Sequence, residues 1–127
     1  MAITLATTLR NTRADAITTF AGAAGAGAKI RIYTAAYATA LVDCVCSLPL
    51  GGAASGGVLT FSAITAGTAS ASGTAAIARI YQSNGTTMVI EGLTVGVSAS
   101  NINITNTTIA TSDTVTVTSA TITEGNP

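Results

Sequence analysis

Short segments in which apolar and polar residues alternate follow one another along most of the chain, and this pattern limits the possible folds. Clusters of glycine, serine, threonine and asparagine separate the segments and are typical of turns. Alternation with a period of two indicates β-strands, and many short strands in succession favour an antiparallel sandwich or barrel. The predicted strands span residues 29–34, 41–48, 57–64, 74–83, 86–95, 101–109 and 114–123. At 127 residues, we expect one domain over 1–127, with an all-β sandwich over 29–127.

The segment before the first predicted strand has the spacing of a helix. Apolar residues recur there at helical intervals, and the charged residues fall between them. The apolar positions are Leu5, Leu9, Ala16, Ile17 and Phe20, and the charged ones are Arg10, Arg13 and Asp15. We therefore expect a short helix over 5–20 within an N-terminal helix and arm, 1–22. Gly22 stands where a chain leaving a helix often turns left-handed.

The stretch GAAGAGAK, residues 22–29, looks like a phosphate loop but matches neither common pattern. A nucleotide-hydrolase loop needs Lys and then Ser or Thr directly after its last glycine, whereas Ala28 precedes Lys29 and Ile30 follows it. The dinucleotide fingerprint, counted from Gly25, needs a glycine where Ile30 stands. The expected element order runs from a helix C-terminus to a strand, and the carbonyl groups exposed there repel phosphate. We interpret the stretch as a flexible connector.

Asn84-Gly85 lies between two apolar-rich segments and predicts a tight β-hairpin. Asn-Gly favours the two left-handed positions of a type I′ turn. Such a turn pairs Ser83 with Thr86, Tyr81 with Met88 and Arg79 with Ile90. One face then carries Ile77, Tyr81, Met88 and Ile90 around Arg79, and the other carries Ala78, Ile80 and Val89 beside Gln82 and Glu91. Because both faces are apolar, we expect the helix or another protein to cover the second one.

The last predicted strand contains a slip in its alternation. Val115 and Val117 share one parity, whereas Ala120 and Ile122 share the other. A strand that changes parity in this way usually contains an extra residue, so we expect a β-bulge near Ser119.

Charge is scarce and balanced. Five basic and five acidic residues give a formal net charge of zero, and only 8% of residues are charged, against about 25% in an ordinary soluble domain. A neutral surface favours association, and we expect a homo-oligomer, most simply a dimer. The basic residues are scattered, which argues against nucleic acid as a partner. No apolar run has the length of a signal peptide core or a membrane span, so we expect synthesis in a cytoplasm and no membrane partner.

The residues used in catalysis and metal binding are few. The chain has no histidine, and its carboxylates, Asp15, Asp43, Glu91, Asp113 and Glu124, are never close in sequence. Cys44 and Cys46 lie on one face of a predicted strand, a poor geometry for a disulfide between them, and we expect buried free thiols. Cys44 beside Asp43 is a weak nucleophile candidate, because neighbours in a strand face opposite ways. We therefore expect no enzyme activity, no cofactor and no metal.

Four segments carry a resemblance to a known family. They are TTLRNTRADAIT, AKIRIYT after a Gly/Ala loop, ARIYQSNGTTMVIEG, and the closing VTVTSATITEGN. In order and spacing the chain resembles small virion structural proteins of tailed bacteriophages, of the capsid cementing, or decoration, type. The resemblance implies a jelly-roll-like β-sandwich that oligomerises over the joints between major capsid subunits. It also implies the major capsid protein as partner and the capsid surface of the virion as location.

The cementing hypothesis needs a contact surface. Arg10, Arg13, Lys29 and Arg31 lie on the predicted helix and first strand, so we expect the N-terminal region to meet the capsid, with residues 22–27 letting the helix adjust. The alternative is that the apolar helix face packs on the sandwich of its own chain. The candidates for a capsid or subunit interface are Leu5, Leu9, Arg10, Arg13, Lys29, Arg31, Ile77, Arg79, Tyr81, Met88 and Ile90.

A second functional hypothesis is a carbohydrate-binding or adhesive module of a tail or tail fibre. Such a module needs a solvent-exposed cluster of aromatic and polar groups. The tyrosines that could form one are Tyr33, Tyr37 and Tyr81.

Overall fold

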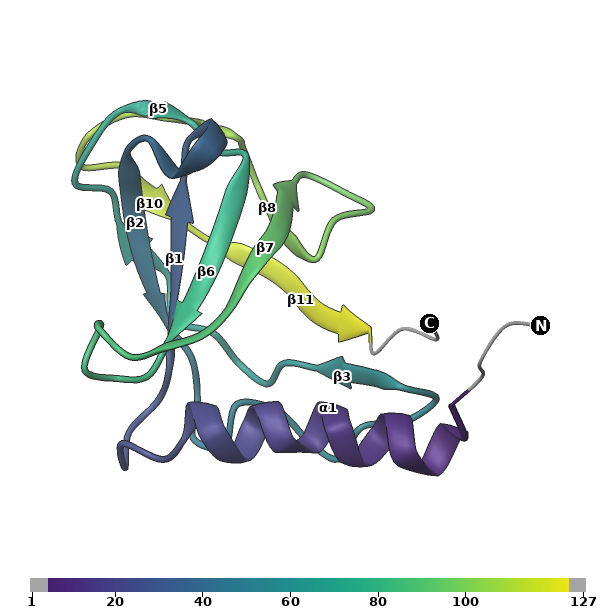
Figure 1. The fold of residues 1–127 in the computed structure, drawn as a ribbon. Coiled ribbons are helices and arrows are strands. Elements are labelled where there is room, and N and C mark those ends of the chain that lie inside the picture. The colour runs from purple at the N-terminus through teal and green to yellow at the C-terminus, as the bar shows by residue number, and fades with distance from the viewer. Residues whose placement is uncertain (1–4, 124–127) are drawn as a thin grey trace.

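In a computed structural model, which describes residues 5–123, the chain is mostly β with one short N-terminal helix (Figure 1). The predicted all-β, jelly-roll-like sandwich class is confirmed. Glu124, the first residues of the predicted arm and the end of the closing motif lie outside the described residues. The elements are α1 (Thr7–Ala21), β1 (Lys29–Tyr33), η1 (Ala35–Tyr37), β2 (Ala40–Val45), β3 (Val58–Thr60), β4 (Gly67–Thr68), β5 (Gly73–Thr74), β6 (Ile77–Tyr81), β7 (Met88–Gly96), β8 (Ile102–Ile104), β9 (Thr108–Ile109), β10 (Thr114–Val115) and β11 (Val117–Thr123).

The main sheet has seven strands in the order β2-β1-β6-β7-β8-β11-β3 and curls around the core (Figure 1). Two short pairs, β10-β4 and β5-β9, complete the described part of the fold. The sheet is mixed rather than wholly antiparallel, because β8 runs parallel to β7 at Val95 and Gly96. The five-residue loop that precedes β8 folds back along β7, and Asn101 Oδ1 accepts a hydrogen bond from Thr94 N at 3.0 Å. This side-chain contact sets a parallel register that alternation alone does not reveal.

The core is built mainly from strand residues that point inward, which alternate along each strand with residues that point outward. In β1, Ile30 and Ile32 are fully buried, whereas Lys29 and Arg31, which alternate with them, are only half-buried. Each such aliphatic side chain contributes about 1.5–3 kcal/mol when it is removed from water. The largest fully buried side chains are Ile30, Ile32, Leu41, Cys44, Leu50, Leu59, Ile80, Ile102 and Ile104. Cys44 and Cys46 are free and buried, as the sequence predicted.

The glycine connector after α1 differs from the prediction. Gly22 ends the helix at φ −87°, and the left-handed residue is Gly25 at φ +85°. The connector is also in close contact with the segment after β2. A Cβ atom on Gly27 would lie 1.9 Å from the carbonyl oxygen of Cys46, and Cys46 N donates to Ala28 O at 2.7 Å. Gly27 therefore serves close packing of two backbones rather than flexibility.

The hairpin around Gly85 confirms part of the prediction. Tyr81 pairs with Met88, and Gly85 is left-handed at φ +73°. The turn is not the predicted two-residue type I′ turn, because Asn84 is not left-handed and residues 83–86 form a four-residue loop. Its closing bond runs from Gln82 N to Thr87 O at 2.9 Å, so the predicted pairing of residues 83 and 86 is wrong.

The Asn84 side chain explains this wider loop. Its Oδ1 accepts hydrogen bonds from the backbone N–H groups of Thr86 and Thr87, both at 2.9 Å. These bonds replace the backbone pairing that a type I′ turn would provide, since Asn side chains commonly bind backbone groups two or three residues ahead.

Bulges in β7 change the register farther from the turn. Ile80 pairs with Ile90 and Ala78 pairs with Leu93, so the predicted pairing of Arg79 with Ile90 is wrong. One extra residue lies between Met88 and Ile90, and the other is accommodated beside Gly92, which is left-handed at φ +80°. Ile90 consequently shares the inner face with Ile80 and packs against the core. The bulge predicted near Ser119 is confirmed, because the β11–β8 register shifts between Val117 and Ser119.

We predict that Gly85→Val lowers the free energy of unfolding by about 1 kcal/mol or more, because a β-branched residue resists positive φ. The new side chain would also approach Arg31 Nη2, which lies 3.4 Å from the Cβ position. Thermal unfolding followed by circular dichroism measures the change. An unchanged melting temperature would contradict the left-handed assignment.

Candidate functional site

The polar side of α1 faces the body of the protein. Asp15 Oδ1 accepts a hydrogen bond from Ala54 N at 2.7 Å, and Asn11 Oδ1 accepts one from Gly57 N at 2.8 Å. The Arg10 guanidinium lies against the backbone of Gly57, where a Cβ atom would come within 2.6 Å of it. The loop 54–57 therefore fixes the helix through polar side chains, including Asp15, which was predicted to lie outside the apolar stripe.

The fully buried residues of α1 are small. Ala14 and Ala21 are fully buried, and Ile17 packs partly against the core. Ala14, Ile17 and Ala21 recur with Arg10 at helical spacing and form one stripe. The helix α1 lies against β3 and β7 (Figure 1). Small side chains let the helix approach the sheet closely. The helix thus packs on its own domain, but through a face other than the predicted one.

Most of the predicted apolar stripe of α1 is turned outward, about a third of a turn from the buried stripe, whereas Ile17 of that predicted stripe packs against the core. Leu9 and Phe20 are each 47% exposed, and Ala16 between them is exposed. An open, mainly apolar groove of about 490 Å³ runs along this side. It is lined by Thr12, Asp15, Ala16, Thr19, Phe20 and Ala23. We call the surface formed by Leu9, Ala16 and Phe20 the outer face of α1. Leu5 is half-buried, and Arg13 is exposed.

A second surface gathers arginines and tyrosines on the outer side of β1 and β6. Its residues alternate with the buried Ile30, Ile32, Ala78 and Ile80, and the β1–β6 register places Arg31 opposite Arg79. The predicted candidates that the structure brings together here are Lys29, Arg31, Ile77, Arg79, Tyr81 and Met88. Ile90 faces the core instead, whereas Leu5, Leu9, Arg10 and Arg13 belong to the α1 region.

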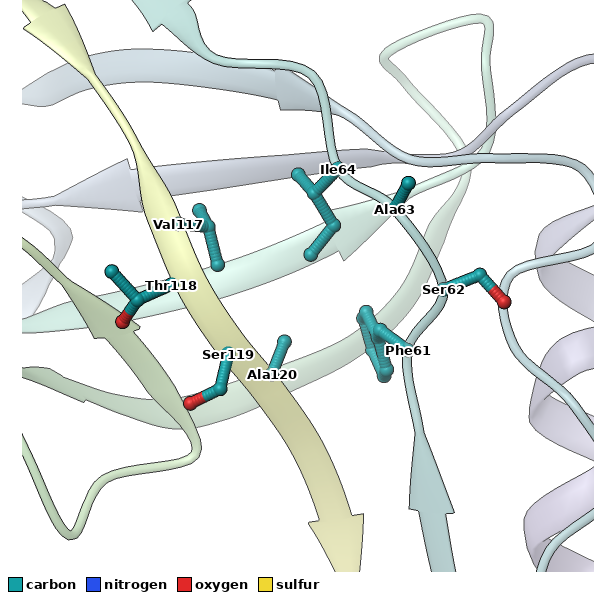
Figure 2. Close-up of a pocket in the computed structure, with 8 residues that line it drawn as sticks. All are labelled: Phe61, Ser62, Ala63, Ile64, Val117, Thr118, Ser119 and Ala120. Atoms are coloured by element: carbon teal, nitrogen blue, oxygen red, sulfur yellow. The ribbon is translucent and has the colours of Figure 1, made fainter.

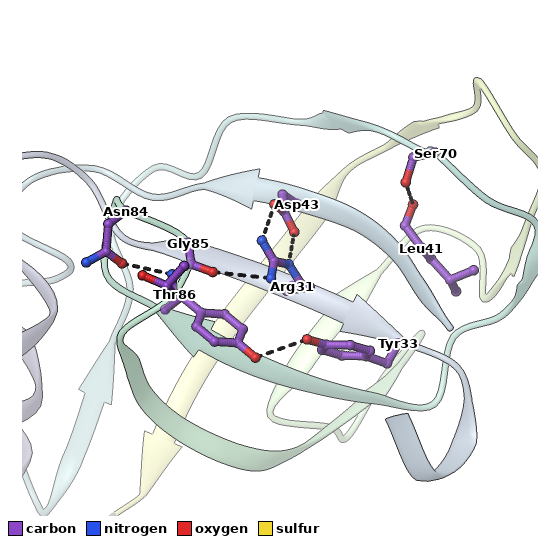
Figure 3. A network of polar contacts seen from close by, with 9 residues as sticks. Arg31, Tyr33, Leu41, Asp43, Ser70, Asn84, Gly85 and Thr86 are labelled. Atoms are coloured by element: carbon purple, nitrogen blue, oxygen red, sulfur yellow. Dashed lines mark hydrogen bonds and ion pairs between the residues drawn. The ribbon is translucent and has the colours of Figure 1, made fainter. Parts of the chain in front are cut away.

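Arg31 is held within this surface by several contacts. Its Nε and Nη2 donate to the two carboxylate oxygens of Asp43 at 2.7 and 2.9 Å, and its Nη1 donates to Gly85 O at 3.4 Å (Figure 3). The guanidinium also stacks 4.7 Å from the centre of the Tyr81 ring. The hydrogen bond to Asp43 raises the pKa of Arg31, so this group stays charged and paired.

Arg79 is covered by two tyrosine rings. Its guanidinium lies 3.8 Å from the centre of the Tyr37 ring and 5.4 Å from that of Tyr33, and its Nε donates to Glu91 Oε2 at 3.1 Å. Tyr37 has φ +57°, an unfavourable conformation for this residue type. Its hydroxyl accepts a hydrogen bond from Gly92 N at 2.8 Å, which fixes the ring.

The position of Tyr37 over Arg79 was not predicted from the sequence. The left-handed backbone at residues 36 and 37 contains no glycine that would have marked it. The Glu91-Gly92 pair was the available signal, because a glycine inside a predicted strand often marks a bulge. That bulge brings Glu91 to Arg79 and presents Gly92 N to Tyr37.

Tyr33 and Tyr81 share a hydrogen bond between their hydroxyls at 3.1 Å (Figure 3). Burial, together with this bond, raises the pKa of Tyr33 above the usual 10.0. The same bond, assisted by Arg79 and Arg31, lowers the pKa of Tyr81, because the Tyr33 hydroxyl donates to the Tyr81 phenolate once that forms.

We predict that native Tyr81 ionises below pH 10.0 and that Tyr33→Phe raises the pKa of Tyr81 by removing this donor. Because folding lowers the pKa of Tyr81, ionisation of this group stabilises the folded state. This stabilisation is present above the unfolded pKa and is lost as pH falls through the lowered pKa. Because folding raises the pKa of Tyr33, the neutral form of this group stabilises the folded state. This stabilisation is present below the unfolded pKa and is lost as pH rises through the raised pKa. Phenolate absorbance of both proteins during an alkaline titration measures the effect. Once the missing phenol is allowed for, an unchanged pKa of the first tyrosine to ionise would contradict the hydroxyl pair.

The two cysteines are poor nucleophiles. Burial raises the pKa of the Cys46 thiol to about 12 and also raises that of Cys44, so both stay protonated at neutral pH. Cys44 Sγ points to Val115 O, at 3.8 Å. Within residues 5–123, no group of three His, Cys, Asp or Glu side chains is placed to hold a metal ion.

A further cavity, of about 220 Å³, lies between β11 and the segment that follows β3 (Figure 2). The side chains of Phe61, Ile64 and Val117 point into the space between the two segments, whereas the hydroxyls of Thr118 and Ser119 point away from it. No polar side chains converge in this cavity, so it offers no chemistry for a reaction.

Comparison with known proteins gives no relative of this chain. No protein-family model, no curated protein and no solved structure matches it. In the described part of the chain, no helix has the length and apolar character needed to span a membrane.

Proposed function

We propose that the chain is a non-enzymatic structural protein of a tailed-phage virion that cements or decorates the icosahedral capsid by binding across major capsid subunits. The observation that carries this proposal is the outer face of α1, where Leu9 and Phe20 are half-exposed on a helix fixed firmly to its domain. A rigid, outward apolar helix face suits association with another protein. The resemblance of TTLRNTRADAIT, the same helix, to virion proteins adds the phage context.

The charged candidates have a different role in this proposal. Arg31 and Arg79 are paired with carboxylates of their own chain, and Arg10 lies against Gly57. Attachment therefore relies on apolar contact rather than on ion pairs with the capsid. Salt screens exposed charge pairs far more than it weakens apolar contact, so moderate salt leaves capsid binding nearly unchanged.

Self-association is part of the same proposal. A two-fold contact covers the same apolar patch on both copies, and we propose a homodimer as the simplest assembly, with a trimer as the other outcome.

The groove on α1 is open and shallow, and a stable interface needs about 800 Å² from each partner. The contact with the capsid therefore extends beyond the outer face of α1.

The tail-fibre hypothesis, in which an exposed cluster of tyrosines binds a carbohydrate, has less support. A sugar-stacking platform requires exposed aromatic rings, but Tyr33 and Tyr81 are only 7% and 9% exposed. Tyr37 lies over Arg79 and packs edge-on against Tyr33, with ring centres 5.3 Å apart. The tyrosines thus stabilise the sheet surface and leave no open platform.

We predict that replacing both Leu9 and Phe20 by glutamine weakens capsid binding at least about tenfold, the equivalent of 1.4 kcal/mol. The folded state should change little, because both side chains are half-exposed. Point variants are preferable to removal of α1, since Ala14 and Ala21 are buried against the domain. Co-sedimentation with heads assembled from the major capsid protein of the encoding genome measures binding, and light scattering measures oligomeric state.

Val97→Gln is the matched control, because Val97 is 61% exposed on a loop away from α1. It should bind like the unaltered chain. A double variant that decorates heads normally would exclude the outer face of α1 as the contact. Removal of the unaltered chain from heads by moderate salt would exclude apolar attachment.

A further inference from the structure

A polar groove lies at the outer edge of β2, where this strand meets the segment around β4. Its volume is about 360 Å³, at the lower end of the range of small-molecule sites. It is lined by Arg31, Ala40, Val42, Asp43, Thr68 and Ser70. The groove does not involve α1.

Backbone contacts hold the two sides of the groove together. Gly67 lies so close to β2 that a Cβ atom there would come within 2.2 Å of Asp43 O. Ser70 N donates to Leu41 O at 2.8 Å, and the Ser70 hydroxyl donates to the same oxygen at 3.4 Å (Figure 3). The groove is therefore formed before any ligand arrives, which lowers the cost of binding.

The polar groups in the groove suit a neutral ligand. Arg31 and Asp43 form a bidentate pair with no net charge, so an anion would meet the carboxylate and a cation would meet the guanidinium. The pair is only partly buried, with side chains 25% and 36% exposed, and a carboxylate oxygen can accept more than one hydrogen bond. Arg31 is also held by Tyr81 and Gly85, so this polar array keeps its shape.

The remaining lining residues complete a surface with both polar and apolar parts. Thr68 supplies a hydroxyl group that can donate and accept hydrogen bonds, and the Ser70 hydroxyl, which donates to Leu41 O, supplies an acceptor. Ala40 supplies an exposed methyl group on β2, and the buried Val42 lines the groove beside it. A pyranose ring has the matching character, with hydroxyls around its rim and C–H groups on its faces.

We infer that this groove binds a neutral polyhydroxylated ligand, a single pyranose ring of a glycan, through the Arg31–Asp43 pair and the hydroxyls of Thr68 and Ser70. No exposed aromatic ring lines the groove, so affinity is weak, with a dissociation constant in the millimolar range. The inference is independent of the proposed function, because the groove and the outer face of α1 share no residue.

The test is saturation-transfer NMR of the full chain with methyl glycosides of glucose, galactose, mannose and N-acetylglucosamine, and with glucuronate and glucosamine as charged comparisons. We expect saturable binding of at least one neutral glycoside, and weaker binding of both charged sugars. Ala40→Leu fills the groove and should weaken that binding about tenfold or more. Thr68→Val, which removes one hydroxyl at similar size, should weaken it several-fold.

Ala38→Leu is the control, since Ala38 is exposed near β2 but does not line the groove. It should bind like the unaltered chain, and circular dichroism should show that all variants are folded. Absence of saturable binding for every neutral glycoside would overturn the inference. Equal binding by Ala40→Leu would place the sugar elsewhere, and tighter binding of glucuronate would make the groove an anion site; either result rejects the assignment.

Discussion

Replacing Gly27 by alanine should lower the free energy of unfolding by about 3 kcal/mol or more, because the new methyl group has no space. Its Cβ atom would lie 1.9 Å from Cys46 O and 3.0 Å from Cys46 C, both backbone atoms that no rotamer change can move. The two segments are also joined by the bond from Cys46 N to Ala28 O. The alanine must therefore separate the connector from the end of β2. Urea unfolding followed by circular dichroism measures the loss.

Gly52→Ala is the matched control for Gly27→Ala. No atom lies within 4 Å of its Cβ position, and Gly52 is not left-handed. Its stability should change by no more than about 0.5 kcal/mol, or increase slightly because alanine restricts the unfolded chain. If Gly27→Ala and Gly52→Ala unfold at the same urea concentration, the close contact between the connector and β2 is wrong.

Local pattern predicted the strands that have one buried face. β1 alternates Ile30 and Ile32 with charged residues, and the structure buries the two isoleucines. The limits of other strands were less predictable. The predicted strand 74–83 contains the end of β5 and all of β6, and 114–123 contains β10 and β11, in each case separated by a short break. Threonine, serine and alanine are compatible with a strand throughout these segments. A strand continues only where a partner strand lies beside it, and that partner is distant in sequence.

The helix shows why the candidate site was only partly predictable. Counting apolar residues selected the stripe with Leu9 and Phe20, but α1 is fixed by Asn11 and Asp15 to backbone N–H groups of residues 54–57. The loop is distant in sequence, so periodicity carries no information about these bonds. Alternation did place Arg79 and Tyr81 on one face of the hairpin, but the pairing of β1 with β6, which brings Arg31 beside them, was not predicted. The covering Tyr37 depends on a left-handed turn and a bulge, which alternation does not describe.

Replacing Ala14 by leucine should lower the free energy of unfolding by about 2–3 kcal/mol, because Ala14 is fully buried where α1 meets the domain. Leucine is nearly as favourable as alanine within a helix, so the expected loss comes from overpacking rather than from helix propensity. The added atoms must push α1 away from the sheet and strain the hydrogen bond from Ala54 N to Asp15. Urea unfolding measures the loss, and faster amide hydrogen exchange at Ala54 would locate it.

Ala16→Leu in the same helix separates the two possible orientations of α1. Ala16 is exposed on the outer face, so leucine there should change stability by no more than about 0.5 kcal/mol. The orientation expected from apolar periodicity, with Ala16 buried, requires Ala16→Leu to be the damaging change and Ala14→Leu to be harmless. Because leucine at position 16 also enlarges the apolar area between Leu9 and Phe20, it should strengthen capsid binding if the proposed function is right. A destabilised Ala16→Leu protein would reverse the assignment of the two faces and remove the surface on which that function rests.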